Sequence, residues 1–261
     1  MGFEVGTLEA FGLYLIRVSA LVLLSPLVGE RLGFAGYKIA LILGLACVLY
    51  LSTGAPTLMA PSTVAYGALA AREALIGSFM ALLGRLAMSS AYLAGHILGF
   101  EMGLQMANQV DPTSGESKSI LALFYEQTFL IALLSVDGHH WIVKSLAATF
   151  EIAPVTVLGG GGTLGVVVVD VLSQTFVAGV AFIAPLSVLM TLVSVAIGLL
   201  ARTVPQINVL EMSFSMRVGA ALVGMTVLAP LFAPAMGRLL EVFDQALQTG
   251  LQALAAGGFG G

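Results

Sequence analysis

The sequence predicts an all-α, polytopic helical membrane protein, and its composition and pattern both indicate this fold class. The chain has 261 residues, of which 59% are hydrophobic and 9% are charged, whereas soluble domains carry roughly a quarter charged residues. Its mean hydropathy is +1.03. Apolar stretches of about 20 residues, the length that an α-helix needs to cross a bilayer, recur along the chain. We therefore expect about six long hydrophobic helices or helical hairpins.

Six stretches have the length and composition of membrane-spanning helices. They are residues 11–28, 39–59, 64–100, 119–136, 164–200 and 209–236. The third and fifth are much longer than one crossing, so each is expected to be a tilted long helix or a helical hairpin. Pro185 offers a kink or turn in the fifth stretch. Lysine and arginine are too few in the connections to predict the orientation of the chain in the membrane.

Charge and cysteine content exclude several classes of function. The net charge of −4 is spread without a basic run, so nucleic acid is not expected as a partner. Cys47 is the single cysteine and cannot form an internal disulfide. Glu4 and Glu9 precede the first apolar run, where a cleavable signal would have a basic region. Membrane insertion is therefore expected to depend on the spans themselves.

Four consecutive glycines, Gly159 to Gly162, interrupt the apolar pattern and cannot hold a helix. They predict a flexible connection at 159–163 between an N-terminal part, residues 1–158, and a C-terminal part, residues 164–261. A plain loop between two spans is an equally good interpretation of the same residues.

Charged side chains lie inside the apolar stretches, which indicates that these helices face protein or water as well as lipid. Charges within membrane helices are costly and usually face a bundle interior, a partner or water. Snorkelling toward the membrane surface is the simpler explanation for Arg85 and Arg202. The positions expected to carry intramembrane charges are Arg17, Arg72, Glu126 and Asp170.

Small residues recur at every fourth position from Ala87 to Ala107. Residues i and i+4 lie on one face of a helix, so this row predicts a groove that another backbone can approach closely. The row predicts close helix packing and does not identify the partner. Its glycines are Gly95, Gly99 and Gly103.

A polar, turn-rich stretch at 101–118 stands between apolar segments. Met102 and Met106 share a helix face, and methionine adapts to irregular neighbours. Asp111-Pro112 is expected to stop the helix, and Thr113-Ser-Gly115 to turn the chain back. The stretch fits a movable channel plug or an ordinary interhelical loop, and spacing alone favours the second. The candidate plug residues are Met102, Met106, Asn108, Gln109, Val110, Asp111 and Pro112.

Asp137, His139 and His140 invite a metal or hydrolase interpretation, which the spacing does not favour. Neighbouring side chains on a helix point about 100° apart, and zinc needs at least three protein ligands. An Asp-Gly turn followed by a helix start explains the residues without chemistry. Neither Ser135 nor Ser114 lies in a nucleophile-elbow motif, and no phosphate loop or cysteine cluster occurs. We expect no enzyme activity, cofactor or metal.

Several of these stretches together resemble one known family. The stretches are 103–106, 110–112, 137–141 (Asp-Gly-His-His-Trp), 184–185 and 198–208. In order and content they resemble the FliR family, the R subunit of the type III secretion export gate. The last stretch and the Gly-His-His-Trp run resemble flagellar members more than the subunits of virulence injectisomes.

The resemblance implies a role that composition alone does not supply. In the family, R assembles with P and Q subunits into an inner-membrane pore within the flagellar basal body, next to B-type and A-type membrane proteins of the export apparatus. Unfolded flagellar export substrates pass through this pore. The R subunit is similar to a P-like part fused to a Q-like part, and residues 106–115 match a plug loop. Gln109 stands where some relatives carry an aromatic residue.

Two functions of other classes remain as alternatives to an export-gate subunit. A secondary transporter would use Arg72, Glu126 and Asp170 as intramembrane charges and broken helices as its substrate site. An intramembrane hydrolase would use Asp137 and His140, although no catalytic motif supports it.

Overall fold

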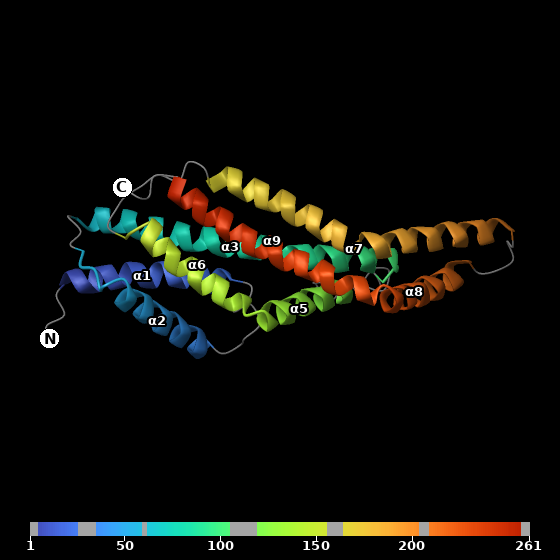
Figure 1. Ribbon diagram of the computed structural model, residues 1–261, viewed down its shortest axis with the longest axis horizontal. Helices are drawn as coiled ribbons and strands as arrows, with labels where there is room; N and C mark the ends of the chain where they lie inside the picture. The colour runs from blue at the N-terminus through green and yellow to red at the C-terminus, as the bar shows by residue number, and fades with distance from the viewer. Residues whose placement is uncertain are drawn as a thin grey trace. The chain divides into compact units, whose positions relative to one another are not determined.

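The computed structural model describes residues 5–25, 35–58, 62–104, 119–155, 164–203 and 209–256, and every regular element in these ranges is an α-helix (Figure 1). The helices are α1 (Val5–Leu24), α2 (Ala35–Ser52), α3 (Thr63–Glu101), α5 (Ile120–Ser135), α6 (Gly138–Ile152), α7 (Leu164–Thr203), α8 (Val209–Val227) and α9 (Ala229–Ala256). The prediction of an all-α fold is confirmed.

The two longest apolar stretches form single continuous helices. α3 has 39 residues and α7 has 40 residues. The sequence left a helical hairpin open at both places, and the structure shows none within these two helices. Pro185 lies inside α7, and the helix continues beyond it to Thr203.

The chain has three to five candidate membrane spans. Three helices, α1, α3 and α7, are long and apolar enough to cross a membrane. The number rises to five if each of two bent pairs, α5 with α6 and α8 with α9, forms one broken span. α2 is apolar but shorter. The chain is therefore a polytopic helical membrane protein, with one to three spans fewer than the six apolar stretches suggest.

The stretch at 209–236, expected to be one span, is two helices that meet at a bend of 76°. α8 ends at Val227, and α9 continues to Ala256, well beyond the expected end. Pro230 explains the position of the break. It has no N–H with which to continue the hydrogen-bond ladder of α8, while a proline is tolerated in the first turn of α9.

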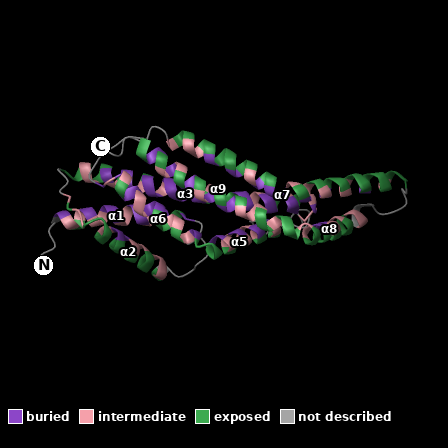
Figure 2. Cartoon of the chain, in the orientation of Figure 1, coloured by how far each residue is buried: buried purple, intermediate pink, exposed green. Residues whose placement is uncertain are grey.

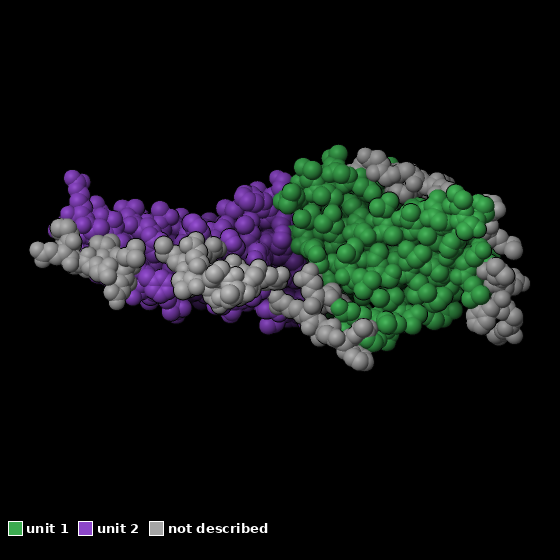
Figure 3. Space-filling view, turned by 180° about the vertical axis from the view of Figure 1, so that it is seen from behind, with its two compact units in different colours: residues 1–87, 136–172, 243–261 green, residues 88–135, 173–242 purple. Residues whose placement is uncertain are grey.

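The described residues form two compact units, coloured separately in Figure 3. Unit 1 contains residues 1–87, 136–172 and 243–261, so it comprises α1, α2, α6 and parts of α3, α7 and α9. Its core includes Leu13, Ile76, Leu83, Leu146 and Phe243, all at most 1% exposed. Glycine allows close packing here, because a Cβ at Gly77 would lie 2.9 Å from the Cβ of Ala20.

Unit 2 contains residues 88–135 and 173–242, from α5, α8 and the remaining parts of α3, α7 and α9. Tyr125, Phe182 and Phe232 form an aromatic cluster with centroid separations of 5.5–6.1 Å. Gly179 of α7 packs on α3, where an added Cβ would lie 2.7 Å from the carbonyl oxygen of Ser90.

The two units are groups of segments that contact one another, and each unit contains residues from both sides of 159–163. They therefore do not test the predicted division there. Residues 156–163 lie outside the described ranges. The fusion of a P-like part and a Q-like part therefore stays a prediction.

Large apolar side chains are exposed on many helices, among them Val166, Leu192 and Leu199 of α7. α7 is exposed along much of its length (Figure 2). Only 28% of the most apolar window of α7 is buried, against 61% for α3. An apolar surface of this extent requires lipid or other protein around it.

Candidate functional site

The candidate plug loop is described at its two ends. Met106, Asn108, Gln109, Val110, Asp111 and Pro112 lie outside the described residues. Met102 is described and is 3% exposed, in a turn that follows the last residue of α3. The structure therefore shows how unit 2 holds the chain where it enters and leaves residues 105–118.

At the entry, α3 ends in a glycine C-cap. Gly103 has φ +74°, its N–H donates to the carbonyl of Phe100 at 3.0 Å, and the N–H of Leu104 donates to that of Gly99 at 3.1 Å. This pair of bonds around a left-handed glycine is the Schellman motif. The sequence predicted a stop at Asp111-Pro112, and α3 ends earlier because Gly103 allows the chain to leave the helix.

At the return, α5 begins against the glycines of α3. A Cβ added to Gly95 would lie 2.6 Å from the Cα of Ala122 and would overlap the carbonyl of Leu121. The hydroxyl of Ser119, just before α5, occupies the space beside Gly99. A helix of the same chain thus fills the groove at Gly95 and Gly99, whereas Gly103 serves as the cap.

The two ends of the loop meet on the last turns of α3. Gly99 accepts the hydrogen bond from Leu104 on the entry side and faces Ser119 on the return side. Residues 105–118 therefore leave and rejoin the body of unit 2 at neighbouring positions.

Two helices of unit 2 hold the entry point through polar contacts. The Glu101 carboxylate accepts a hydrogen bond from the hydroxyl of Ser187 on α7. Its backbone carbonyl accepts one from Nη1 of Arg217 on α8 at 3.3 Å. Sequence reasoning placed Glu101 at the start of the polar stretch but did not predict either partner. Ser187 and Arg217 lie 86 and 116 residues from Glu101 in the sequence, and local sequence patterns do not predict contacts over such distances.

Two of the four predicted intramembrane charges come together in the core of unit 1. Nε of Arg17, on α1, lies 2.5 Å from Oε2 of Glu73 on α3, and both side chains are 0% exposed. Arg72 Nη1 lies 2.8 Å from the other oxygen, Oε1. One carboxylate thus serves two guanidinium groups. A buried charge is tolerated when it is paired and hydrogen-bonded, and the Arg17–Glu73 pair meets both conditions.

Both arginines also donate hydrogen bonds at the end of α6. Arg17 donates to the hydroxyl of Thr149 at 3.1 Å and to the carbonyl of Ala153 at 2.7 Å. Arg72 donates to the carbonyl of Pro154 at 3.0 Å. Arg17 also lies 4.2 Å above the ring of Phe150, a cation–π contact. The arginine–glutamate cluster therefore binds α1, α3 and the end of α6 together.

The other two predicted charges lie elsewhere. Glu126 is partly buried on α5, in unit 2, and Asp170 is exposed on α7. Their roles stay predictions.

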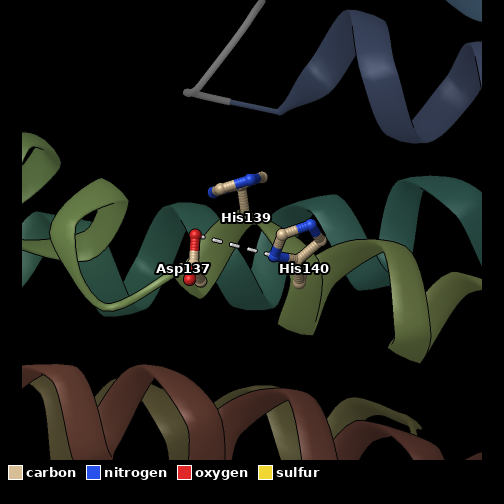
Figure 4. A group of neighbouring side chains, drawn as sticks. All are labelled: Asp137, His139 and His140. Atoms are coloured by element: carbon tan, nitrogen blue, oxygen red, sulfur yellow. Dashed lines mark ion pairs between the residues drawn. The ribbon is translucent and has the colours of Figure 1, made fainter.

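Asp137, His139 and His140 form the start of α6 (Figure 4). Asp137 is the N-cap residue with φ 57°, and its carbonyl accepts from the N–H of His140 at 2.9 Å. The Asp-Gly turn followed by a helix start agrees with the interpretation that needs no chemistry. The Ser135 hydroxyl donates to the carbonyl of Ala132 at 2.7 Å, so it is engaged within its own helix.

The fold, the arginine–glutamate cluster and the contacts at the loop entry together define the class of protein. It is a polytopic helical membrane protein with a buried charge cluster and a polar loop that is held at its entry. The chain belongs to the family of bacterial export proteins, family 1, whose model matches residues 8–243.

Its relatives are flagellar biosynthetic proteins named FliR. The one from Escherichia coli is 30% identical over 239 residues, covering 88% of each chain. The one from Bacillus subtilis is 27% identical over 217 residues, covering 82% of this chain and 83% of the relative. The one from Caulobacter vibrioides is 26% identical over 232 residues, covering 87% and 92%. The chain is a component of flagellar biosynthesis and export.

Proposed function

We propose that this chain is the R-type, non-enzymatic subunit of a bacterial flagellar type III protein export gate. With P and Q subunits it forms an inner-membrane pore, within the basal body, through which unfolded flagellar substrates pass. The loop near residues 106–115 closes the channel until a substrate engages it.

The observation that carries this proposal is the frame of the loop. Its ends meet at Gly99, and α7 and α8 hold its entry through Glu101. A segment that closes a pore must move while the surrounding wall keeps its shape, and this frame provides a fixed base for such a segment. Membership of the family of bacterial export proteins supports a role in which a loop closes an export pore.

Further proposed features follow from the same assignment. The P-like part, residues 1–158, and the Q-like part, residues 164–261, are joined by the connection at 159–163. B-type and A-type membrane proteins of the export apparatus are neighbours. The flagellar names of the relatives favour a flagellar gate over an injectisome gate. The apolar surface of α7 supports an assembly in which protein partners cover helices.

Co-purification tests the assignment. The full chain, expressed with P and Q homologues and extracted in detergent, should give a complex whose intact mass contains all three subunits. Expressed alone it should yield little folded monomer, because its apolar surface lacks partners. A well-folded monomer or homo-oligomer that ignores the P and Q homologues would contradict the proposal and favour a secondary transporter.

A further inference from the structure

Three metal-binding side chains gather at the start of α6, all in unit 1 (Figure 4). Asp137, His139 and His140 each offer one ligand atom, and these atoms lie within 4.8 Å of one another. Nδ1 of His140 lies 3.8 Å from Oδ1 of Asp137. Two imidazoles and a carboxylate are a ligand set that proteins use for zinc and related ions.

The geometry removes the main objection that the sequence raised. Adjacent side chains in a regular helix diverge, yet the ring centroids of His139 and His140 lie 4.2 Å apart, with the planes tilted by 35°. These two residues stand in the first turn of α6, directly after the left-handed Asp137. The irregular start of the helix therefore lets both rings and the carboxylate converge.

One nitrogen in the cluster lacks a hydrogen bond. Nδ1 of His139 is buried and has no hydrogen-bond partner among the described residues. A buried polar atom without a partner calls for a water or an ion that satisfies it. The Asp137 side chain makes no capping hydrogen bond to α6, so its carboxylate is available to another ligand.

We propose that Asp137, His139 and His140 bind one divalent transition-metal ion of the zinc type, with water completing its coordination. In tetrahedral geometry at about 2.0–2.1 Å from the metal, neighbouring ligand atoms lie roughly 3.3–3.5 Å apart. Side-chain rotation can close the remaining gap, because the Asp137 and His140 side chains are 74% and 59% exposed. The Asp137 carboxylate offsets the partial positive charge of the helix N-terminus, which by itself disfavours a cation.

The bound ion would stabilise the first turn of α6, because it would coordinate the side chains of Asp137, His139 and His140 together. It takes the place of the missing side-chain cap. The same helix ends at the arginine–glutamate cluster, where Arg17 holds Thr149 and Ala153. The ion would thus stabilise the free end of a helix whose other end is already fixed.

Cobalt binding tests this proposal on the full-length, detergent-extracted protein. Co²⁺ is added after chelator treatment, and its visible absorption is followed to saturation and then reversed with Zn²⁺. We expect one saturable site per chain. Asp137→Asn, His139→Asn and His140→Asn should each weaken binding about tenfold or more, since losing even a residue that supports a metal ligand costs about 10–100-fold.

His96→Asn is the matched control, because His96 is the remaining histidine of the chain and belongs to α3. It should bind as the wild type does. Circular dichroism checks that each variant keeps its helical content, and Asp137→Glu, which keeps a carboxylate, should retain part of the affinity. Absence of a saturable site in the wild type, or unchanged binding in the His140→Asn variant, would overturn the proposal.

Discussion

Arg17 and Glu73 form an ion pair that is completely buried and joins α1 to α3, with 2.5 Å between Nε and Oε2. The same carboxylate holds Arg72 at 2.8 Å. Glu73 is thus the negative charge bonded to both guanidinium groups. The stability of unit 1 should depend on it more than on either arginine alone.

Replacing that carboxylate by an amide should destabilise the protein strongly. In Glu73→Gln, two buried guanidinium groups lose their counter-ion, and breaking a buried pair in this way costs about 3–5 kcal/mol. The yield and thermal stability of the detergent-extracted complex measure the loss. Asp170→Asn, the same kind of change at an exposed position, should have little effect. Equal stability of the two variants would contradict the role of the cluster.

The tight packing of α5 on α3 predicts opposite effects of alanine at two glycines of the same helix. In Gly95→Ala the new methyl group meets the backbone of Leu121 and Ala122, which cannot move aside cheaply. Overpacking of this kind costs about 1–3 kcal/mol. Gly67→Ala is the matched control, because nothing lies within 4 Å of its added Cβ. It should be neutral or stabilise by about 0.4–1 kcal/mol.

Thermal unfolding of the two variants in one detergent provides the comparison. A Gly95→Ala protein as stable as the Gly67→Ala protein would mean that α5 does not pack on α3 as described. Gly95→Leu should go further and block assembly while membrane insertion continues.

The glycine cap predicts which side chains are tolerated at the entry to the loop. Gly103 has φ +74°, a conformation that asparagine accepts more readily than β-branched residues do. Gly103→Val should therefore destabilise the end of α3, by about 1–2 kcal/mol, while Gly103→Asn stays close to wild type. Limited proteolysis near residue 105 checks this, with faster cleavage expected only in the valine variant. Equal cleavage of both variants would refute the cap.

Local sequence patterns predicted the long helices and the charged residues within them, but not the residues that these charged side chains contact. Apolar length predicted α3 and α7, and charge within apolar runs singled out Arg17 and Arg72. Their contacts with Thr149, Ala153 and Pro154 join residues 82 to 136 positions apart, which no local pattern encodes.

Gly103 shows the opposite problem, because one residue fits two patterns. Gly103 belongs to a row of small residues at every fourth position, and this row predicted that the helix continues to Ala107. Its backbone instead takes the left-handed conformation of a C-cap. The spacing of small residues describes a face only as long as the helix continues, and a glycine is also the residue that most readily ends one.

If the loop near residues 106–115 closes a channel, deleting Gln109 through Thr113 should open it. The entry and return points at Gly103 and Ser119 remain, so the P, Q and R complex should still assemble with its normal mass. Ion conductance across the inner membrane, or the membrane potential, is then compared with wild type. We expect an assembled gate that leaks ions, impaired or deregulated export, and a milder leak from Met106→Ala. An assembled deletion variant that is tight to ions and competent in export would show that the loop does not close a channel and is an ordinary interhelical connection.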